Sequence, residues 1–137
     1  MNESELARVA QYVARQVSAF PEVAGAYLYG SVLDELHAGS DIDVAVVLAP
    51  RSVEGLWDEL ELEVRIQRLL GNWEGHPFHV TALDPLQPLF SFRPIRDGRL
   101  VYVGDDTALT DFIEYVSRAY ADLAPRHRRA VNEVLTP

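Results

Sequence analysis

Two aspartates placed two residues apart are the strongest chemical feature of the sequence. Asp41 and Asp43 begin a run of apolar residues, and alternate residues of a strand point to the same side of a sheet. Two carboxylates held close together resist joint ionisation unless a cation lies between them. Magnesium suits such a pair, because it binds hard oxygen ligands and completes its coordination with waters and phosphate oxygens. The spacing therefore predicts a divalent-metal site with Asp41 and Asp43 as ligands.

A glycine and a serine supply the expected phosphate contacts. Gly30 and Ser31 precede the aspartates, separated from them by a polar loop that ends at Ser40. A glycine allows the backbone to approach a phosphate group closely, and the Ser31 amide and hydroxyl can donate hydrogen bonds to it. Together with the aspartates, this pair predicts a site for a metal and a phosphate.

Each half of this pattern also has an ordinary structural interpretation. A Gly-Ser pair is common in turns, and an Asp-x-Asp sequence is common in ordinary loops, where Asp side chains hydrogen-bond to the nearby backbone. Asp43, however, stands inside an otherwise apolar run, where an unpaired charge is costly. The combination favours a functional site over a simple turn.

Two apolar runs and their flanking helices must position these residues. Ala26–Tyr29 and Val44–Ala49 predict buried strands, because β-branched and aliphatic residues follow one another without helical spacing. Asn2–Phe20 has apolar residues at intervals of three and four, which predicts an amphipathic helix over the sheet. Ser52 is expected to cap a second helix over Val53–Leu70.

The second half of the chain predicts further strands and helices. In the second helix we expect a packing stripe formed by Leu56, Trp57, Leu60, Val64 and Leu69. After it we expect a third strand over Pro77–Asp84. A short helix over Leu86–Phe92 should follow, capped by Asp84, with Pro85 at its first position, and ended before Pro94. The chain should then form a strand over Arg99–Val103 and a helix over Ala108–Leu123, which Pro125 restarts. The direction of the third strand is left open.

Composition limits the possible functions. The chain has 137 residues and a net charge of −9, with 21 acidic against 12 basic residues. A nucleic-acid groove needs a basic surface, so direct binding of DNA or RNA is not expected. There is no Cys, which excludes disulfides and thiol catalysis, and no apolar run of membrane-spanning length. We therefore expect a cytoplasmic protein with one domain, residues 1–137, and no membrane association.

The order of the features resembles the signature of a known superfamily. A strand, a Gly-Ser pair, a short polar loop, an Asp-x-Asp pair and an apolar strand are similar to the signature of the DNA polymerase beta-type nucleotidyltransferases. The small size resembles the minimal nucleotidyltransferase (MNT) branch, the MntA-like antitoxins that are commonly partners of HEPN-domain toxins. Phe78–Leu83 is similar to the third strand of the family, and Ile95–Tyr102 (IRDGRLVY) to a further family segment.

The resemblance implies a fold, a reaction and a partner. The implied fold is α/β (α+β), a small mixed β-sheet flanked by helices, with a carboxy-terminal helical segment over about residues 106–135. The implied reaction is the Mg²⁺-dependent transfer of AMP from ATP, with two magnesium ions, to a hydroxyl of a HEPN toxin. The nucleotide would contact Gly30, Ser31 and Ser40. The resemblance leaves room for a homo- or hetero-oligomer.

Two departures from the family pattern leave alternatives open. Many relatives carry arginines just after the Gly-Ser pair, whereas Val32–Ser40 contains none. His79 stands where the third carboxylate is expected, so the catalytic set becomes Asp41, Asp43 and His79. Imidazole is a poor magnesium ligand, and His79 is either a general base or an ordinary strand residue. The alternative function is therefore a catalytically weakened or inactive antitoxin that neutralises its toxin by binding alone.

One dense positive patch occurs near the end of the chain. It consists of Arg126, Arg128 and Arg129. Such a cluster is either a solvated helix face or a contact for a partner or a phosphate group.

Overall fold

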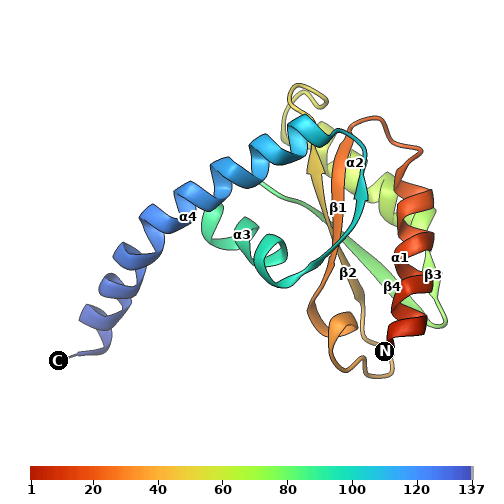
Figure 1. Cartoon of the computed structure of the whole chain (residues 1–137), viewed down its shortest axis with the longest axis horizontal. Coiled ribbons are helices and arrows are strands. Elements are labelled where there is room, and N and C mark those ends of the chain that lie inside the picture. Colours follow the sequence, from red (N-terminus) through yellow and green to blue (C-terminus); the bar gives the residue numbers. More distant parts are fainter. Residues whose placement is uncertain (137) are drawn as a thin grey trace.

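The computed structural model describes residues 1–136 and forms a sheet covered by helices (Figure 1). Its elements, in chain order, are α1 (Glu3–Val17), β1 (Val23–Tyr29), the 3-10 helix η1 (Gly30–Leu33), β2 (Ile42–Leu48), α2 (Leu56–Leu70), β3 (Asn72–Trp73), β4 (His76–Ala82), α3 (Pro88–Asp97), β5 (Arg99–Val103) and α4 (Asp106–Leu135).

The sheet is mixed, as expected, and has the strand order β3-β4-β2-β1-β5. β1 pairs antiparallel with both β2 and β5, whereas β2 pairs parallel with β4. This answers the open question of the third strand, which is parallel to the strand that carries Asp43. The register sets Asp43 opposite Tyr29 on one side and opposite His79 on the other.

The two faces of the sheet are covered by different helices, α1 and α2 on one side and α3 with the first half of α4 on the other (Figure 1). Alternation along β2 assigns its side chains to these faces. Val44 and Val46 pack with the α1 and α2 core, whereas Ala45 and Val47 pack with Leu109 of α4. Asp43 is two residues before Ala45 and therefore points to the same face, so its carboxylate lies on the α3 side of the sheet.

The first helix follows the prediction closely. Asn2 is its N-cap, with the side-chain oxygen accepting the Glu5 N–H at 2.8 Å. Its buried side chains are Leu6, Val9, Val13 and Val17. The helix ends at Val17, a few residues before the predicted end at Phe20.

The prediction for the second helix was wrong at its start and in its buried face. α2 begins at Leu56 after Gly55, whose φ of 107° breaks the helical path, and the buried Ser52 hydroxyl finds no hydrogen-bond partner among the described residues. The expected packing stripe is exposed, up to 85% at Trp57. Leu62, Ile66 and Leu70 form the buried face instead.

The reason for this rotation is the edge of β4. Along that edge the Val80 N–H donates to Gln67 Oε1 at 2.9 Å, and the Ala82 N–H donates to the Glu63 carboxylate. α2 therefore turns polar side chains toward the strand edge that no neighbouring strand covers. Gly71 ends the helix, as predicted, with a φ of 66°.

The third and fourth helices tolerate prolines that were expected to break them. α3 begins at Pro88 rather than behind Asp84, and it includes Pro94. Asp84 instead closes a turn by accepting the Leu86 N–H at 2.9 Å, and its carbonyl accepts the Ser91 hydroxyl. The lost bond at Pro94 falls on the carbonyl of the exposed Phe90, where water can replace it.

The last helix, α4, runs through Pro125 without a break, so the expected restart there was wrong. Asp105 caps it by accepting the Ala108 N–H. Every residue from 125 to 136 is exposed, and this half of the helix projects away from the sheet (Figure 1). No helix within residues 1–136 is both long and apolar enough to cross a bilayer.

Candidate active site

The end of β1, the turn of η1 and the start of β2 bring Gly30 against Asp43. Gly30 has a φ of 79°, a conformation that other residues rarely adopt. A Cβ atom built at this position would lie 2.8 Å from Asp43 Oδ2, closer than real Cβ contacts. The backbone conformation therefore favours a glycine, and any side chain at this position would also force the Asp43 carboxylate to move.

Asp43 is a partly buried carboxylate with unbalanced charge. Its side chain is 30% exposed, and its Oδ1 atom lies 3.7 Å from His79 Nδ1. Burial raises the pKa of Asp43, His79 opposes this shift, and the negative charge of Asp41 adds to it. Among the ion pairs of residues 1–136 this carboxylate has no arginine partner. The site would be stabilised by a cation.

Asp41 and Ser40 lie in the approach to β2 rather than in the strand. Asp41 is exposed, yet close enough for its charge to act on Asp43. The Ser40 carbonyl oxygen is 2.9 Å from His76 Nδ1, and because a carbonyl only accepts, the ring N–H must donate. His76 therefore fixes the backbone beside Asp41, a role that nothing in its sequence context had indicated.

His79 is brought next to Asp43, but its role is not fixed by that contact. The distance of 3.7 Å is too long for a hydrogen bond, and the ring is 55% exposed. The charge of His79 also lowers the pKa of Glu63 in α2, so the imidazole acts on a second carboxyl besides Asp43. An accessible ring in such surroundings can accept a proton, as the general-base interpretation needs, or simply be solvated.

The two aspartates fit a metal ion that binds together with its substrate, not a metal site that protein residues complete by themselves. Within the described part of the chain, no group of three or more His, Asp or Glu residues could hold a metal ion. Asp41 and Asp43 offer carboxylate oxygens only. Magnesium is typically held by one or two carboxylates plus waters and substrate phosphates. The two aspartates therefore suit magnesium bound together with a polyphosphate.

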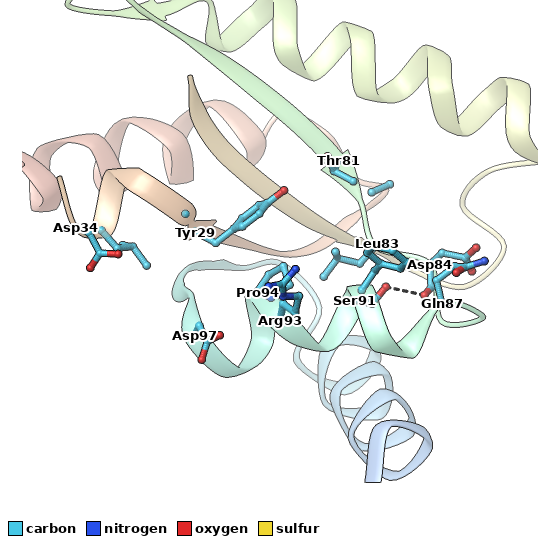
Figure 2. Close-up of a pocket in the computed structure, with 14 residues that line it drawn as sticks. Tyr29, Asp34, Thr81, Leu83, Asp84, Gln87, Ser91, Arg93, Pro94 and Asp97 are labelled. Carbon is cyan, nitrogen blue, oxygen red and sulfur yellow. Dashed lines mark hydrogen bonds between the residues drawn. The ribbon is translucent and has the colours of Figure 1, made fainter. Parts of the chain in front are cut away.

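A cavity of about 880 Å³ opens directly beside this cluster, between the sheet and α3 (Figure 2). Its strand side includes Tyr29, Gly30 and Thr81, and its helix side includes Phe90 and Arg93. This volume lies within the range of small-molecule sites. Asp41, Asp43 and His79 do not line the cavity themselves, but the Asp43 carboxylate lies against Gly30, which does.

Tyr29 lines the cavity and is the neighbour of Asp43 across the sheet. Burial raises the pKa of its hydroxyl, a hydrogen bond with Thr81 lowers it, and the charge of Asp43 raises it again. The phenol therefore stays protonated and donor-capable at neutral pH. The sequence predicted a ligand contact at Gly30 but none at Tyr29 or in α3, because it indicated only a short helix over Leu86–Phe92 and not that this helix lies over the sheet.

The predicted site residues are thus partly brought together. Gly30, Asp43 and His79 form one cluster, with Asp41 at its margin. Ser31 follows Gly30 in η1 and is half-buried, whereas Ser40 contributes a backbone contact to His76. The arrangement can hold a cation beside a cavity of ligand size.

Similar solved structures include toxin–antitoxin complexes. A chain of a toxin–antitoxin with AMP-PNP has a TM-score of 0.69 and 18% identity, covering 93% of this chain and 98% of that one. A chain of an MntA–HepT mutant, in which two aspartates are replaced by glutamates, has a TM-score of 0.64 and 17% identity, covering 99% and 100%. A chain from a tri-AMPylated Shewanella oneidensis HEPN toxin bound to an MNT antitoxin has a TM-score of 0.65 and 17% identity, covering 94% and 98%.

At these identities the structural likeness shows the fold alone. Comparison with curated proteins finds no significant match. A family model described as polymerase beta, nucleotidyltransferase, matches residues 11–107, a span that holds Gly30, Asp43 and His79. Because this match covers most of the 137 residues, the chain belongs to the polymerase beta nucleotidyltransferase family.

Proposed function

We propose that this protein transfers AMP from ATP to a hydroxyl group of a HEPN-domain toxin and so acts as its antitoxin. The observation that carries the proposal is the contact between Gly30 and Asp43. It sets a partly buried carboxylate of raised pKa against a glycine that lines a cavity of about 880 Å³. The proposal places the reaction in the cytoplasm, where ATP and magnesium are available.

In the proposed reaction each residue has a defined task. Asp41 and Asp43 would hold Mg²⁺, while the Gly30 backbone and the Ser31 amide receive the phosphates. When bound, Mg²⁺ neutralises the developing charge of the phosphoryl group. The acceptor oxygen attacks the α-phosphorus, a new P–O bond forms, and the bond to the departing pyrophosphate breaks. The proton of the acceptor hydroxyl passes to His79, which acts as the general base.

The partner part of the proposal draws on the structural neighbours. One is a toxin–antitoxin bound to AMP-PNP, and another contains an AMPylated HEPN toxin with its MNT antitoxin. A third carries two Asp-to-Glu replacements that are spaced like Asp41 and Asp43. A shared fold with these complexes supports a HEPN toxin as the acceptor and a hetero-oligomer as the working form.

A second candidate is a non-catalytic antitoxin that neutralises its toxin by binding alone. The observation that favours it is His79 in the position where a third carboxylate is expected. Without that carboxylate, the described residues offer no metal site of three ligands. In this alternative the cavity is retained but the transfer step is lost.

Label transfer separates the two candidates. The protein is incubated with MgCl₂, the product of its neighbouring gene and ATP labelled on either the α- or the γ-phosphate. Transfer of the α-label alone, absent in an Asp43→Asn variant, is the expected result. A tight complex with no transfer would establish the binding role instead, and neither transfer nor binding would contradict both candidates.

A further inference from the structure

The phosphate end of the site lacks positive charge. The loop that follows the Gly-Ser pair, residues 32–40, contains two acidic residues, Asp34 and Glu35, and no arginine. Asp41 and Asp43 add two more carboxylates near the same turn. Polyphosphates in proteins are commonly neutralised by arginine, whose planar guanidinium matches two phosphate oxygens at once. A cation from elsewhere in the fold is needed.

The cavity supplies one such cation. Arg93 of α3 is the one basic side chain among the described residues that line it, and it shares the cavity with Gly30. In Figure 2, Arg93 rises from α3 on the side that faces Tyr29 and the strand ends. Helical spacing explains this direction, because Phe90, Arg93 and Asp97 lie at intervals of three and four on one helix face and all line the cavity.

The Arg93 guanidinium is left without a carboxylate by the arrangement of its own helix. Asp97, the acidic side chain nearest along that face, is held by Arg96 through two hydrogen bonds, Nε to Oδ1 at 3.0 Å and Nη2 to Oδ2 at 2.9 Å. The positive charge of Arg93 still acts on Asp97 from a distance. Within residues 1–136 none of the ion pairs includes Arg93.

The helix that carries Arg93 is firmly seated. Ser91 is buried, and its hydroxyl donates to the Asp84 carbonyl at 2.7 Å. Phe92, the residue before Arg93, stacks on Tyr120 of α4 with ring centroids 4.3 Å apart. These contacts fix the orientation of α3, so Arg93 keeps its position at the cavity wall while its side chain remains exposed to an incoming ligand.

We propose that Arg93 is the phosphate-binding cation of this site and contacts the polyphosphate of the nucleotide that fills the cavity. The inference rests on the proposed nucleotide-binding function and assigns the charge recognition to α3 instead of the loop after Gly30. The ligand class is a nucleoside triphosphate with magnesium. Adenosine, which lacks phosphates, should not depend on Arg93.

The test compares charged and uncharged ligands by isothermal titration calorimetry in MgCl₂. The unaltered protein is titrated with AMP-PNP and with adenosine, and so are the variants Arg93→Gln, Arg93→Lys and Arg99→Gln. Arg99 is the matched control, since it removes the same charge from an arginine that pairs with Glu3 outside the cavity. The melting temperature of each variant checks that the fold is intact.

We expect Arg93→Gln to weaken AMP-PNP binding about tenfold or more, the effect of one charged hydrogen-bonded contact, and to leave adenosine binding unchanged. Arg93→Lys should recover part of the loss, and Arg99→Gln should bind both ligands as the unaltered protein does. If Arg93→Gln binds AMP-PNP normally, the assignment of Arg93 is wrong although nucleotide binding stands. If the unaltered protein binds neither ligand, the nucleotide-binding function fails first and the assignment of Arg93 fails with it.

Discussion

At the scale of single residues, the site depends on one close approach. Gly30 directly follows β1, Asp43 lies in β2, which pairs antiparallel with β1, and the carboxylate occupies the space that a side chain at position 30 would need. The same carboxylate carries a raised pKa because of burial and of Asp41. Such an arrangement is unfavourable for packing alone, so it indicates a position kept for a ligand.

Replacing Gly30 with alanine should therefore damage both stability and activity. The left-handed backbone alone costs about 1–2 kcal/mol for a residue with a Cβ. In addition, the new methyl group would displace Asp43 Oδ2, so nucleotidyl transfer should be lost. Urea unfolding and the label-transfer assay measure the two effects.

Gly39 offers a matched control for this variant. It also has a positive φ, 82°, but a Cβ there would meet no atom within 4 Å. Gly39→Ala should lose a similar amount of stability and keep its activity. Equal loss of activity in both variants would show that the contact with Asp43 is not what matters.

At the scale of elements, α2 forms hydrogen bonds with the edge of the sheet as well as packing against the core. Glu63 and Gln67 accept N–H groups of β4 that have no partner strand. This use of polar side chains explains why the apolar stripe read from the sequence lies in solvent. Periodicity identified the helix and its end at Gly71, but it could not reveal the strand edge that sets the rotation of the helix.

Glu63 also makes stability depend on pH. Its pKa is raised by burial and by Glu59, against the hydrogen bond from Ala82 and the charge of His79. A raised carboxyl pKa in the folded state means that folding favours the protonated form. The corresponding stability is fully present below the unfolded value of 4.5 and is lost as the pH rises through the folded pKa.

The variant Glu63→Gln should consequently melt at a slightly higher temperature than the unaltered protein at pH 7 to 8. The amide oxygen still accepts the Ala82 N–H, but the buried charge is gone. The gain should shrink on acidification and vanish below pH 4.5. Glu61→Gln, an exposed position on the same helix, serves as the control; an equal gain there would point to overall net charge instead.

At the scale of the whole molecule, sequence and structure agree on the mixed sheet and on the cluster of Gly30, Asp43 and His79. Gly30 and Asp43 follow from local patterns, namely apolar runs, a glycine and carboxylates two apart, whereas the mixed sheet and His79 were expected from the family resemblance. Arg93, Tyr29 and His76 were missed, because their roles arise only when α3 closes over the sheet and β4 lies beside β2. Long-range packing creates the cavity, and no local spacing signals it.

The end of α4 lies outside this packing. Residues 125–136 are exposed throughout, whereas Val116 is fully buried and Tyr120 stacks on Phe92. Removing residues 125–137 should therefore leave the melting temperature nearly unchanged and AMP-PNP binding intact, since neither the sheet nor the cavity beside Gly30 uses that half of the helix.

A deeper truncation tests the same reasoning from the other side. Removal of residues 115–137 deletes Val116 and the stacked Tyr120, and the loss of such buried contacts should cost about 2–5 kcal/mol. It should also weaken AMP-PNP binding. Phe92 would lose its contact with Tyr120, which holds α3, and therefore Arg93, in place. Urea unfolding and calorimetry distinguish the two truncations. Equal stability in both would mean that α4 contributes nothing to the fold beyond its first turns, and the account of a cavity held in shape by α3 and α4 would be wrong.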